Sequence, residues 1–528
     1  MLWYDSRAQR LRERSAVWTV NQKADPGFQG LPPKYAEELQ KNILGTVVLP
    51  GDPEYDTDRM LSNPRFSAYP QVIVYCEVET DVAECLRVAR ALSMAVVVRS
   101  GGHSTAGFSS QNGFLIDVSR MNDVCISPEA LRAWVGPGTN FGKFNAKLLP
   151  YDLHTPGGAC PDVCVGGYMQ GGGYGFTARI FGMNCDQVEE IRVMMTDGRI
   201  VHANAELNQD LFWAVRGGTG SNFGVLLGVK YRLYRGSTFA GFSVRWSMQT
   251  DAGVQDTATS LAWLQENFMR TGAPDTMGYQ MIWAFEGPEG QTKEPVLLMR
   301  GMYRGTREEL QEKLAPVLAL PGATLQALYD PQQYIDLNRI LLSEPYEVPE
   351  FPADMTPMPP PEAKISRYVA KPIDAAGWKV LLDYFRTSPS PYTIAAMEIY
   401  GGAIARMPKG ENAFFHRDVY CDLFFDVFWL TEQEKETMLA FIAGWEAAFA
   451  PHWTGQSYQN YPSPDNPGFA DEYWGDTYWL LRLIKHKYDP LNLLRFPQSI
   501  EPLEWHPPGP GFPPGFHGFE EPIKAITG

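Results

Sequence analysis

Glycine is concentrated in one segment of this 528-residue chain, between residues 157 and 175. The segment reads Gly157-Gly-Ala-Cys-Pro-Asp-Val-Cys-Val-Gly-Gly-Tyr-Met-Gln-Gly-Gly-Gly-Tyr-Gly. So many glycines raise the conformational entropy that folding must remove, and we expect the close approach of something large and flat to justify them. Cys160 precedes a proline, which holds its backbone extended. The other interpretation of this thiol is a small, buried hydrophobic side chain.

A second glycine motif, Arg99-Ser-Gly-Gly-His-Ser, follows a run that is typical of a buried strand. Glycine permits positive φ and the close approach of a ligand to the backbone, and successive N–H groups in such a loop bind an anion, typically a diphosphate. The motif is not GxGxxG and no helix follows in register, so the nicotinamide fingerprint does not apply. Taken alone, the motif is also compatible with a tight turn that carries a hydrogen-bonded histidine.

The chain has a formal net charge of −16 and a sequence pI near 5.1. A surface of this sign repels phosphate backbones, which argues against a nucleic-acid partner. The first residues contain no apolar run of signal-peptide length, and no stretch approaches the roughly 18 apolar residues of a membrane span. We therefore expect a cytoplasmic protein without a membrane partner. A group of arginines near the start fits one solvated face of a short helix: Arg7, Arg10, Arg12 and Arg14.

Hydrophobic periodicity predicts a βαβ-like unit ahead of the histidine motif, with strands at 71–76 and 95–99 and a helix at 81–92. Longer strands and helices alternate after residue 236. The proline-rich stretch at 345–361 is interpreted as a surface or active-site loop. We expect three segments: an N-terminal cofactor lobe, a substrate domain and a C-terminal return to the cofactor lobe, at residues 1–235, 236–464 and 465–528. The cysteines show no CxxC pair or zinc-finger spacing, so no metal site is expected.

Six motifs in the same order resemble the FAD-linked oxidases of the berberine bridge enzyme type, within the vanillyl-alcohol oxidase family. They are Arg99-Ser-Gly-Gly-His-Ser, Gly158-Ala-Cys-Pro-Asp-Val-Cys-Val-Gly-Gly, Gly171-Gly-Gly-Tyr-Gly, Asp210-Leu-Phe-Trp-Ala-Val-Arg-Gly-Gly with Asn222-Phe-Gly, Tyr458-Gln-Asn-Tyr, and Tyr488-Asp-Pro-Leu-Asn with Gln498-Ser-Ile. The resemblance implies an α+β, two-lobed FAD-binding fold of the PCMH type. Its central substrate domain is expected to be an antiparallel sheet covered by helices.

The resemblance also implies that FAD is bound covalently, through two bonds. His103 matches the position that attaches the flavin 8α-methyl group through an imidazole nitrogen, and Cys160 matches the position that attaches flavin C6 through sulfur. Two tethers would hold the ring rigidly and leave its surroundings open to a bulky substrate. The other residues expected to bind the cofactor are Arg99, Ser100, Gly101, Gly102, Ser104, Val163, Gly166, Gly167, Gly172, Gly173 and Asn222.

Val163 matches the gatekeeper position of the family, where a valine leaves space for dioxygen and a leucine is associated with dehydrogenases. We therefore expect dioxygen to be the electron acceptor. Cys164 and Tyr168 depart from the family pattern, which often has Gly and His at these positions. Cys164 is a second thiol that could compete with Cys160 for the flavin, although its offset from the motif argues against this. Tyr168 is expected to alter the hydrogen bonding near the flavin or to pack as an ordinary side chain.

On the substrate side, Tyr461 matches the catalytic tyrosine of the family. A tyrosine can accept the hydroxyl proton of an alcohol when its neighbours lower its pKa; the alternative is a buried structural tyrosine. Glu398 and Tyr400 share one face of a predicted strand. They are expected to contact substrate or orient Tyr461, or else to form an ordinary pair on the sheet surface. Four aromatic side chains are expected to be available for stacking against a substrate: Trp283, Trp429, Trp453 and Tyr458.

These motifs together predict an FAD-dependent oxidase of a small molecule. It would convert a hydroxyl group of a sugar, an oligosaccharide or a secondary metabolite to a carbonyl or lactone and reduce dioxygen to hydrogen peroxide. The alternative is an oxidative cyclase or dehydrogenase that acts on a secondary metabolite (an alkaloid, a polyketide or an aromatic alcohol) with the same bicovalent flavin. A non-catalytic flavin- or carbohydrate-binding protein is opposed by the presence of Tyr461 beside both attachment residues.

Overall fold

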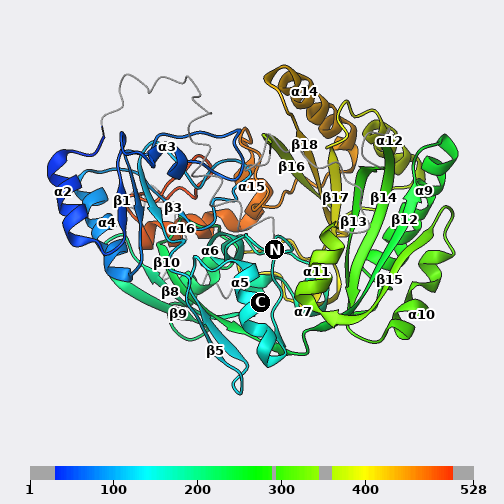
Figure 1. Ribbon diagram of the computed structural model, residues 1–528, viewed down its shortest axis with the longest axis horizontal. Coiled ribbons are helices and arrows are strands. Elements are labelled where there is room, and N and C mark those ends of the chain that lie inside the picture. The colour runs from blue at the N-terminus through cyan, green and yellow to red at the C-terminus, as the bar shows by residue number, and fades with distance from the viewer. Residues whose placement is uncertain (1–29, 288–292, 344–359, 504–528) are drawn as a thin grey trace, which may run out of the picture.

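The computed structural model describes residues 30–287, 293–343 and 360–503. Figure 1 shows two groups of sheets side by side, with the N-terminal strands on one side and a large sheet formed by the middle of the chain on the other. The expected arginine-bearing helix near the start lies outside the described residues. Residues 345–359 of the proline-rich stretch lie outside them as well.

The first sheet has four strands in the order β1-β2-β4-β3, of which the last three are parallel. Its strands are β1 (Thr46–Val48), β2 (Val72–Tyr75), β4 (Phe114–Asp117) and β3 (Val96–Arg99). Helix α4 (Glu79–Ala91) joins β2 to β3 and packs against α2 (Pro33–Asn42) over an aliphatic core. The predicted βαβ-like unit is confirmed, with β4 inserted between its two strands.

The second sheet is antiparallel, in the order β5-β6-β10-β8-β9. Its strands are β5 (Val124–Ser127), β6 (Arg132–Val135), β10 (Val225–Arg232), β8 (Val188–Met194) and β9 (Ile200–Asn204). Four helices share its core: α5 (Phe141–Leu148), α6 (Val165–Gln170), α8 (Gln209–Val215) and α16 (Tyr478–Tyr488). The shorter connecting elements include β7 (Leu153–His154), α7 (Ala178–Phe181), β11 (Tyr234–Arg235) and α15 (Phe469–Trp474).

The end of the described chain packs on these first two sheets through a buried lysine. Lys485 Nζ donates to the carbonyl oxygens of Asn222 at 2.7 Å and Leu494 at 2.6 Å, and it lies 2.7 Å from the Asp489 carboxylate. Leu494 in turn bridges to Val96 of β3. A buried cation needs such a complete set of partners, so these contacts fix residues 485–494 against the loop that follows α8. The three-segment division at residues 235 and 464 stays a prediction.

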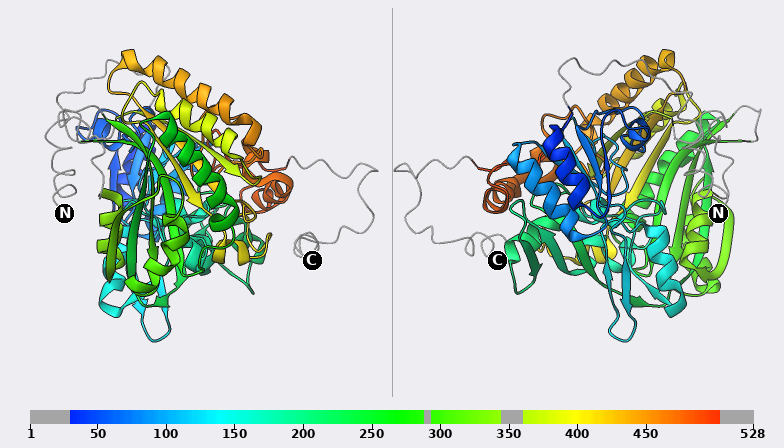
Figure 2. Two further views of the ribbon diagram at one scale, coloured as in Figure 1. Left: turned by 90° about the vertical axis from the view of Figure 1, so that its right-hand side faces the viewer. Right: turned by 60° about the vertical axis from the view of Figure 1, so that its left-hand side comes forward.

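The third sheet has seven antiparallel strands in the order β15-β12-β14-β13-β17-β18-β16. They are β15 (Thr324–Gln333), β12 (Thr238–Ser247), β14 (Glu294–Tyr303), β13 (Met277–Glu286), β17 (Ile394–Ile399), β18 (Cys421–Phe428) and β16 (Glu362–Val369). Helices cover one of its faces (Figure 2): α9 (Asp251–Leu264) with the π-helix η3 (Gln265–Met269), α10 (Arg307–Leu318), α12 (Ala375–Arg386) and α14 (Glu432–Phe449). The prediction of an α+β chain with a helix-covered antiparallel sheet is confirmed.

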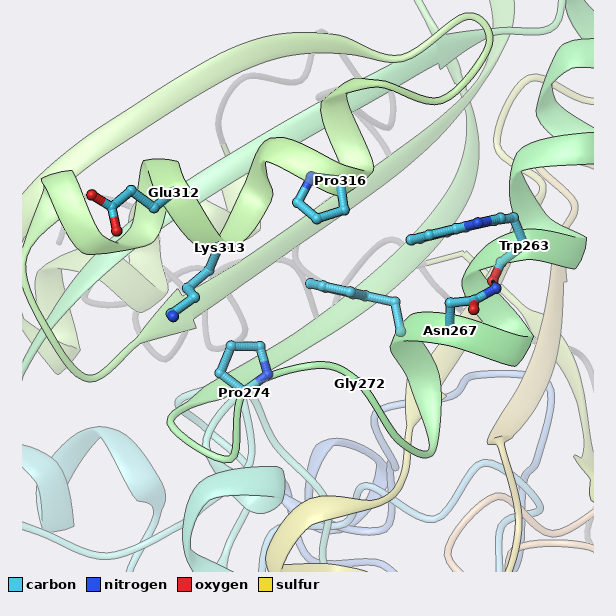
Figure 3. A pocket seen from close by; sticks show the side chains of 8 residues that line it. Trp263, Asn267, Gly272, Pro274, Glu312, Lys313 and Pro316 are labelled. Carbon is cyan, nitrogen blue, oxygen red and sulfur yellow. Dashed lines mark hydrogen bonds between the residues drawn. The ribbon is translucent and has the colours of Figure 1, made fainter.

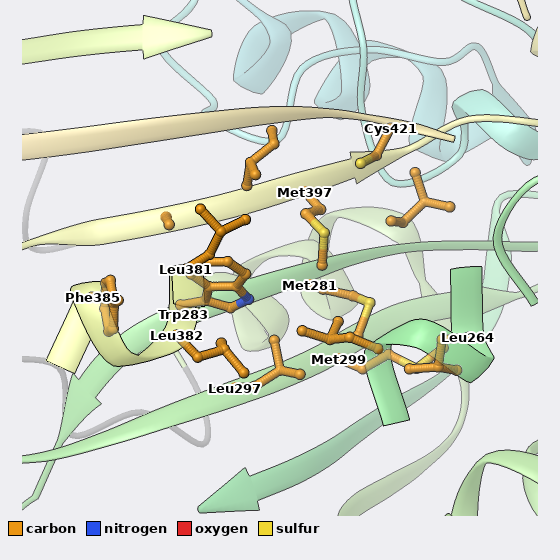
Figure 4. Close-up of a cluster of buried hydrophobic side chains, with 14 of the residues drawn as sticks. Leu264, Met281, Trp283, Leu297, Met299, Leu381, Leu382, Phe385, Met397 and Cys421 are labelled. Atoms are coloured by element: carbon orange, nitrogen blue, oxygen red, sulfur yellow. The ribbon is translucent and has the colours of Figure 1, made fainter. Parts of the chain in front are cut away.

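The helix-covered face of this sheet is apolar. Side chains such as Met281, Trp283 and Met397 alternate along the strands toward the helices and form one close-packed cluster (Figure 4). Trp283 is fully buried there and Trp429 is 2% exposed. The expectation that these two tryptophans are available for stacking against a substrate is therefore wrong, because they fill the core beneath α12 and α14.

The opposite face of the same sheet carries polar side chains in register. Strand pairing places one row across the neighbouring strands β14, β13, β17, β18 and β16, and a strand alternates its side chains between two faces. The row consists of Arg300, Gln280, Glu398, Asp422 and Tyr368. These residues are all at least nine-tenths buried, so this face is covered as well, by the elements that carry the glycine segments.

Two buried arginines join the large sheet to the glycine-rich part. Arg417 forms a two-pronged ion pair with Asp186, with both N–O distances at 2.7 Å. Arg179 of α7 donates to the carbonyl oxygens of Tyr400 at 2.9 Å and Met277 at 2.7 Å. Guanidinium groups with all their contacts inside the protein resist separation, so the polar face is fixed against the glycine segments.

Among the described residues, no helix has the length and apolar composition that crossing a membrane requires.

Candidate active site

The turn that contains Cys160 is held by the start of helix α5. The N–H of Phe141 donates to the carbonyl of Val163 at 3.0 Å, and the N–H of Gly142 donates to that of Pro161 at 2.7 Å. The first N–H groups of a helix have no partner within it, so the turn supplies their acceptors. The thiol of Cys160 is exposed at this turn.

His103 contacts the same turn. Its Nε2 lies 2.7 Å from Oδ2 of Asp162, two residues after Cys160. Gly101 packs against the turn so closely that a Cβ there would lie 3.0 Å from Sγ of Cys164. The surrounding protein atoms, together with the Asp162 carboxylate, raise the pKa of Cys160 to about 11. The structure thus brings the histidine loop and the Cys160 turn together, although they are more than fifty residues apart in the chain.

The histidine loop presents a run of free backbone donors. No acceptor in the described ranges binds the N–H groups of residues 100–104, which are Ser100, Gly101, Gly102, His103 and Ser104. Gly167 of α6 is exposed, and a Cβ on it would meet nothing within 4 Å. A run of unpaired N–H groups beside an open glycine surface fits an anionic group such as a diphosphate.

The other residues expected at the cofactor are engaged within the protein. Arg99 pairs with Asp117 at 2.5 Å. The N–H groups of Gly166, Gly172 and Gly173 donate to Pro137, Met169 and Tyr458, and the Asn222 amide binds carbonyls of its own loop and the N–H of Ile500. These contacts fix the glycine loops in position, and direct contact of these groups with a cofactor stays a prediction.

Many of the glycines are explained by the protein's own aromatic rings. The ring of Tyr168 lies between Gly158 and Gly173, where a Cβ would approach it to 3.1 Å and 2.4 Å. A Cβ on Gly157 would lie 2.4 Å from the Phe141 ring. The expectation that only a large flat ligand would justify these glycines is therefore wrong at these three positions. The ring of Tyr168 packs, and its hydroxyl donates to the Tyr174 carbonyl.

Cys164 does not present its sulfur as Cys160 does. It is 8% exposed, its thiol donates to the Gly138 carbonyl at 3.4 Å, and burial raises its pKa to about 12. Gly101 covers the sulfur. Of the two thiols, only Cys160 is open to a reaction partner.

Tyr461 lies between the loop that carries His103 and the glycine-rich segment 157–175. Asn460 Nδ2 donates to the carbonyl of Tyr168 at 3.0 Å, and Thr105 Oγ1 donates to the carbonyl of Pro462 at 3.4 Å. The residues on both sides of Tyr461 are therefore bound, one to the segment that follows Cys160 and the other to the loop that carries His103.

The hydroxyl of Tyr461 donates to Oε1 of Glu398 at 2.7 Å, across 63 positions of the chain. Burial, reinforced by the Asp422 carboxylate, raises the pKa of Glu398 to about 8. Burial and Glu398 raise the pKa of Tyr461 as well. A lowered pKa was expected for the catalytic tyrosine, whereas Tyr461 keeps its proton and donates it in a hydrogen bond to a carboxyl group. The pair can therefore pass a proton on, from a substrate hydroxyl to Tyr461 and from Tyr461 to Glu398.

Lys364 supplies the positive charge next to this pair. Its Nζ lies 4.5 Å from the centre of the Tyr461 ring, 2.9 Å from Asp426 and 3.7 Å from Glu362. Three charged residues near Tyr461 were not expected from the sequence: Lys364, Asp422 and Asp426. The sequence pattern that could have found them is alternation. In residues 362–364 and 422–426, charged side chains stand at even positions and the residues between them are apolar.

Tyr400 follows β17 but does not join the Tyr461 pair. Its hydroxyl shares a 3.0 Å hydrogen bond with that of Tyr368, and its ring stacks against Tyr174 with centroids 5.8 Å apart. The structure thus brings Glu398, but not Tyr400, to the side chain of Tyr461.

A separate hollow of about 380 Å³ lies between η3 and α10 (Figure 3). Its lining includes Trp263, Asn267, Pro274 and Pro316. None of the residues expected from the sequence to act in catalysis or cofactor binding lines it, so we assign the candidate active site to the region around Tyr461.

Comparison with known proteins identifies the family. A model of the FAD binding domain matches residues 70–204, and a model described as berberine and berberine like matches residues 457–501. The FAD-linked oxidoreductase YvdP of Bacillus subtilis is 30% identical over 472 residues, which cover 87% of this chain and 98% of that protein. The chain belongs to the berberine bridge enzyme-like family of FAD-linked oxidoreductases. The predicted resemblance is therefore confirmed.

Other similar proteins support the same assignment. The carbohydrate oxidase of Microdochium nivale is 27% identical over 481 residues, covering 87% of this chain and 93% of that enzyme. The structure of BBE-like 1 from Physcomitrella patens superposes with a TM-score of 0.78 at 27% identity, over 89% of this chain and all of the other. The cofactor is FAD, and both the unpaired N–H groups of the histidine loop and the exposed thiol of Cys160 fit it.

Proposed function

We propose that this enzyme is an oxidase that holds FAD through both His103 and Cys160. Its substrate is a sugar or oligosaccharide, whose hydroxyl group is converted to a carbonyl or lactone while dioxygen is reduced to hydrogen peroxide. The substrate class rests on the carbohydrate oxidase among its relatives. The choice of dioxygen rests on Val163, whose small side chain stands in the Cys160 turn.

The observation that carries this proposal is the 2.7 Å hydrogen bond between Tyr461 and Glu398. FAD supplies the two-electron acceptor for the carbon that is oxidised. The chain must then remove the hydroxyl proton, and Tyr461 takes it while its own proton moves to Oε1 of Glu398. Lys364 stabilises negative charge that develops on the Tyr461 ring, since a cation over an aromatic ring is attracted to it.

The proton relay predicts that activity rises with pH. Glu398 must be ionised to accept the Tyr461 proton, and its pKa is raised to about 8. Below that pH the carboxyl group is already protonated and the relay is blocked, so kcat is expected to increase in proportion to the ionised fraction and to level off at higher pH. Initial rates measured across this range test the prediction. Glu398→Gln provides the control, because glutamine does not ionise and the variant therefore lacks this ascending limb of the pH profile. A wild-type rate that is independent of pH between 6 and about 9 would contradict it.

Lys364→Met is expected to shift the same limb upward by about one pH unit and to lower kcat about tenfold. Removal of the cation leaves Asp426 and Glu362 without their partner, so the negative charge around Glu398 increases. Lys364→Arg keeps the charge and serves as the matched control. A shift of the ascending limb to lower pH in Lys364→Met would contradict the role assigned to Lys364.

The substrate class is tested by peroxide release. The purified enzyme is supplied with mono- and oligosaccharides and, separately, with alkaloid, polyketide and aromatic alcohols, and hydrogen peroxide and oxygen are followed together. Peroxide formed with the sugars at the rate of oxygen consumption supports the proposal. Turnover only with an artificial dye would identify a dehydrogenase, and a cyclised product would identify the oxidative cyclase.

A further inference from the structure

Glu398 and Asp422 are direct cross-strand neighbours on the polar face of the large sheet. Glu398 is 2% exposed and Asp422 is fully buried. Each carboxyl group has one hydrogen-bonded oxygen: Oε1 of Glu398 accepts from Tyr461 at 2.7 Å, and Oδ1 of Asp422 accepts from Ser366 at 2.5 Å. Their second oxygens, Oε2 and Oδ2, are buried and lack a partner in the part of the chain that the structure describes.

The cations near Glu398 and Asp422 form ion pairs with other carboxylates. Lys364 Nζ contacts Asp426 at 2.9 Å, and Arg367 points to the other face of the sheet, where it binds Glu446 of α14. The titratable and charged groups that face the pair are Glu362, Lys364 and Tyr368 on β16, Asp426 on β18, Arg300 on β14, and Tyr168, Tyr174, Tyr400, Tyr458 and Tyr461 from the surrounding segments. Two adjacent buried carboxyl groups without a cation of their own disfavour ionisation together.

We propose that Asp422 is a positioning residue that sets the proton affinity of Glu398, and with it the pH at which the Tyr461–Glu398 relay operates. The inference rests on the proposed function. The negative charge of Asp422, held in place by the Ser366 hydroxyl, makes Glu398 a stronger base. The proton that Tyr461 releases therefore stays on Oε1 of Glu398, while Asp422 keeps its charge and touches neither substrate nor cofactor.

The Ser366 hydroxyl couples this pair to the catalytic loop. It donates to Asp422 and accepts from the backbone N–H of Tyr458 at 3.0 Å. Tyr458 lies three residues before Tyr461, and their rings meet edge to face at 5.0 Å. The position of Asp422 and that of the Tyr461 loop are therefore defined by one hydroxyl group. Burial, together with the Asp426 carboxylate, raises the pKa of Asp422 to about 7, next to the value of about 8 at Glu398.

The decisive variant is Asp422→Asn, which keeps the shape and the acceptor for Ser366 but removes the charge. The ascending limb of kcat/KM against pH is expected to move to lower pH by about one unit. Asp422→Glu restores the charge and is expected to return the limb toward the wild-type position. Asp383→Asn, the same charge change on the helix-covered side in α12, is expected to leave the limb in place. A limb that stays fixed in Asp422→Asn while the rate falls at every pH would show a purely structural role and overturn the proposal.

A second measurement does not depend on turnover. The infrared carbonyl stretch of a protonated carboxyl group, assigned to Glu398 by its loss in Glu398→Gln, reports the proton directly. In Asp422→Asn the pH at which this band disappears is expected to fall by about one unit relative to the wild type. An unchanged midpoint would overturn the role of Asp422 even if no substrate were known. A shifted midpoint in an enzyme that oxidises no sugar would support it and place the error in the proposed substrate class.

Discussion

Tyr461→Phe is expected to lower kcat by a factor of about 10² to 10⁴, the usual contribution of a positioned proton acceptor. The ring remains between the glycine loops, so substrate binding and the flavin spectrum are expected to persist. Only the hydroxyl that donates to Glu398 at 2.7 Å is lost. Steady-state oxygen consumption and single-turnover bleaching of the flavin measure the effect.

The matched control for this substitution is Tyr478→Phe in α16. That ring stacks on Trp474, with centroids 5.6 Å apart, and has no contact with Glu398 in the described structure. Turnover is expected to be unchanged there. Full activity of Tyr461→Phe would remove Tyr461 from the proton relay and leave Glu398 to accept the proton alone.

The double variant His103→Ala, Cys160→Ala is expected to release all of its FAD on denaturation in acid, whereas the wild-type polypeptide retains the yellow colour. Either single variant keeps one bond and therefore retains the pigment. The measurement is the absorbance of the pellet and supernatant, together with the mass of the flavin-bearing peptides. The expectation rests on the contact of His103 with the Cys160 turn and on the exposure of that thiol.

Cys164→Ser provides the control for attachment. Its sulfur is buried under Gly101, so the variant is expected to retain the pigment as the wild type does. Loss of covalent flavin in Cys164→Ser, together with its retention in Cys160→Ala, would reverse the assignment of the two thiols. Release of all the pigment from the wild-type chain would contradict both attachments.

Local patterns in the sequence predicted the first βαβ-like unit and named His103 and Cys160 as attachment candidates, whose bonds to the flavin stay a prediction. Continuous β-branched runs and three-to-four-residue periodicity predicted β2, α4 and β3, because these signals come from residues a few positions apart. The motifs around His103, Cys160 and Tyr461 carried the family resemblance in the same way. The reason for the many glycines between residues 157 and 175 was only partly predicted from the sequence. The rings of Tyr168 and Phe141 that require Gly158, Gly173 and Gly157 are brought there by folding.

The grouping of charged side chains around Tyr461 was decided by the tertiary structure. Glu398, Asp422 and Lys364 lie on three strands whose order in the sheet no local pattern specifies, and their pKa values depend on burial and on neighbours across those strands. The same limitation misplaced Trp283 and Trp429, since an aromatic side chain suits a core and a binding site equally well until the face of the sheet is known. The sequence by itself determined the family, and it named the loops predicted to hold the flavin and the candidate for the catalytic tyrosine. Only the packed sheet decided which carboxyl group lies against the Tyr461 hydroxyl, because the environment of a buried charge is set by neighbours that are distant in the chain.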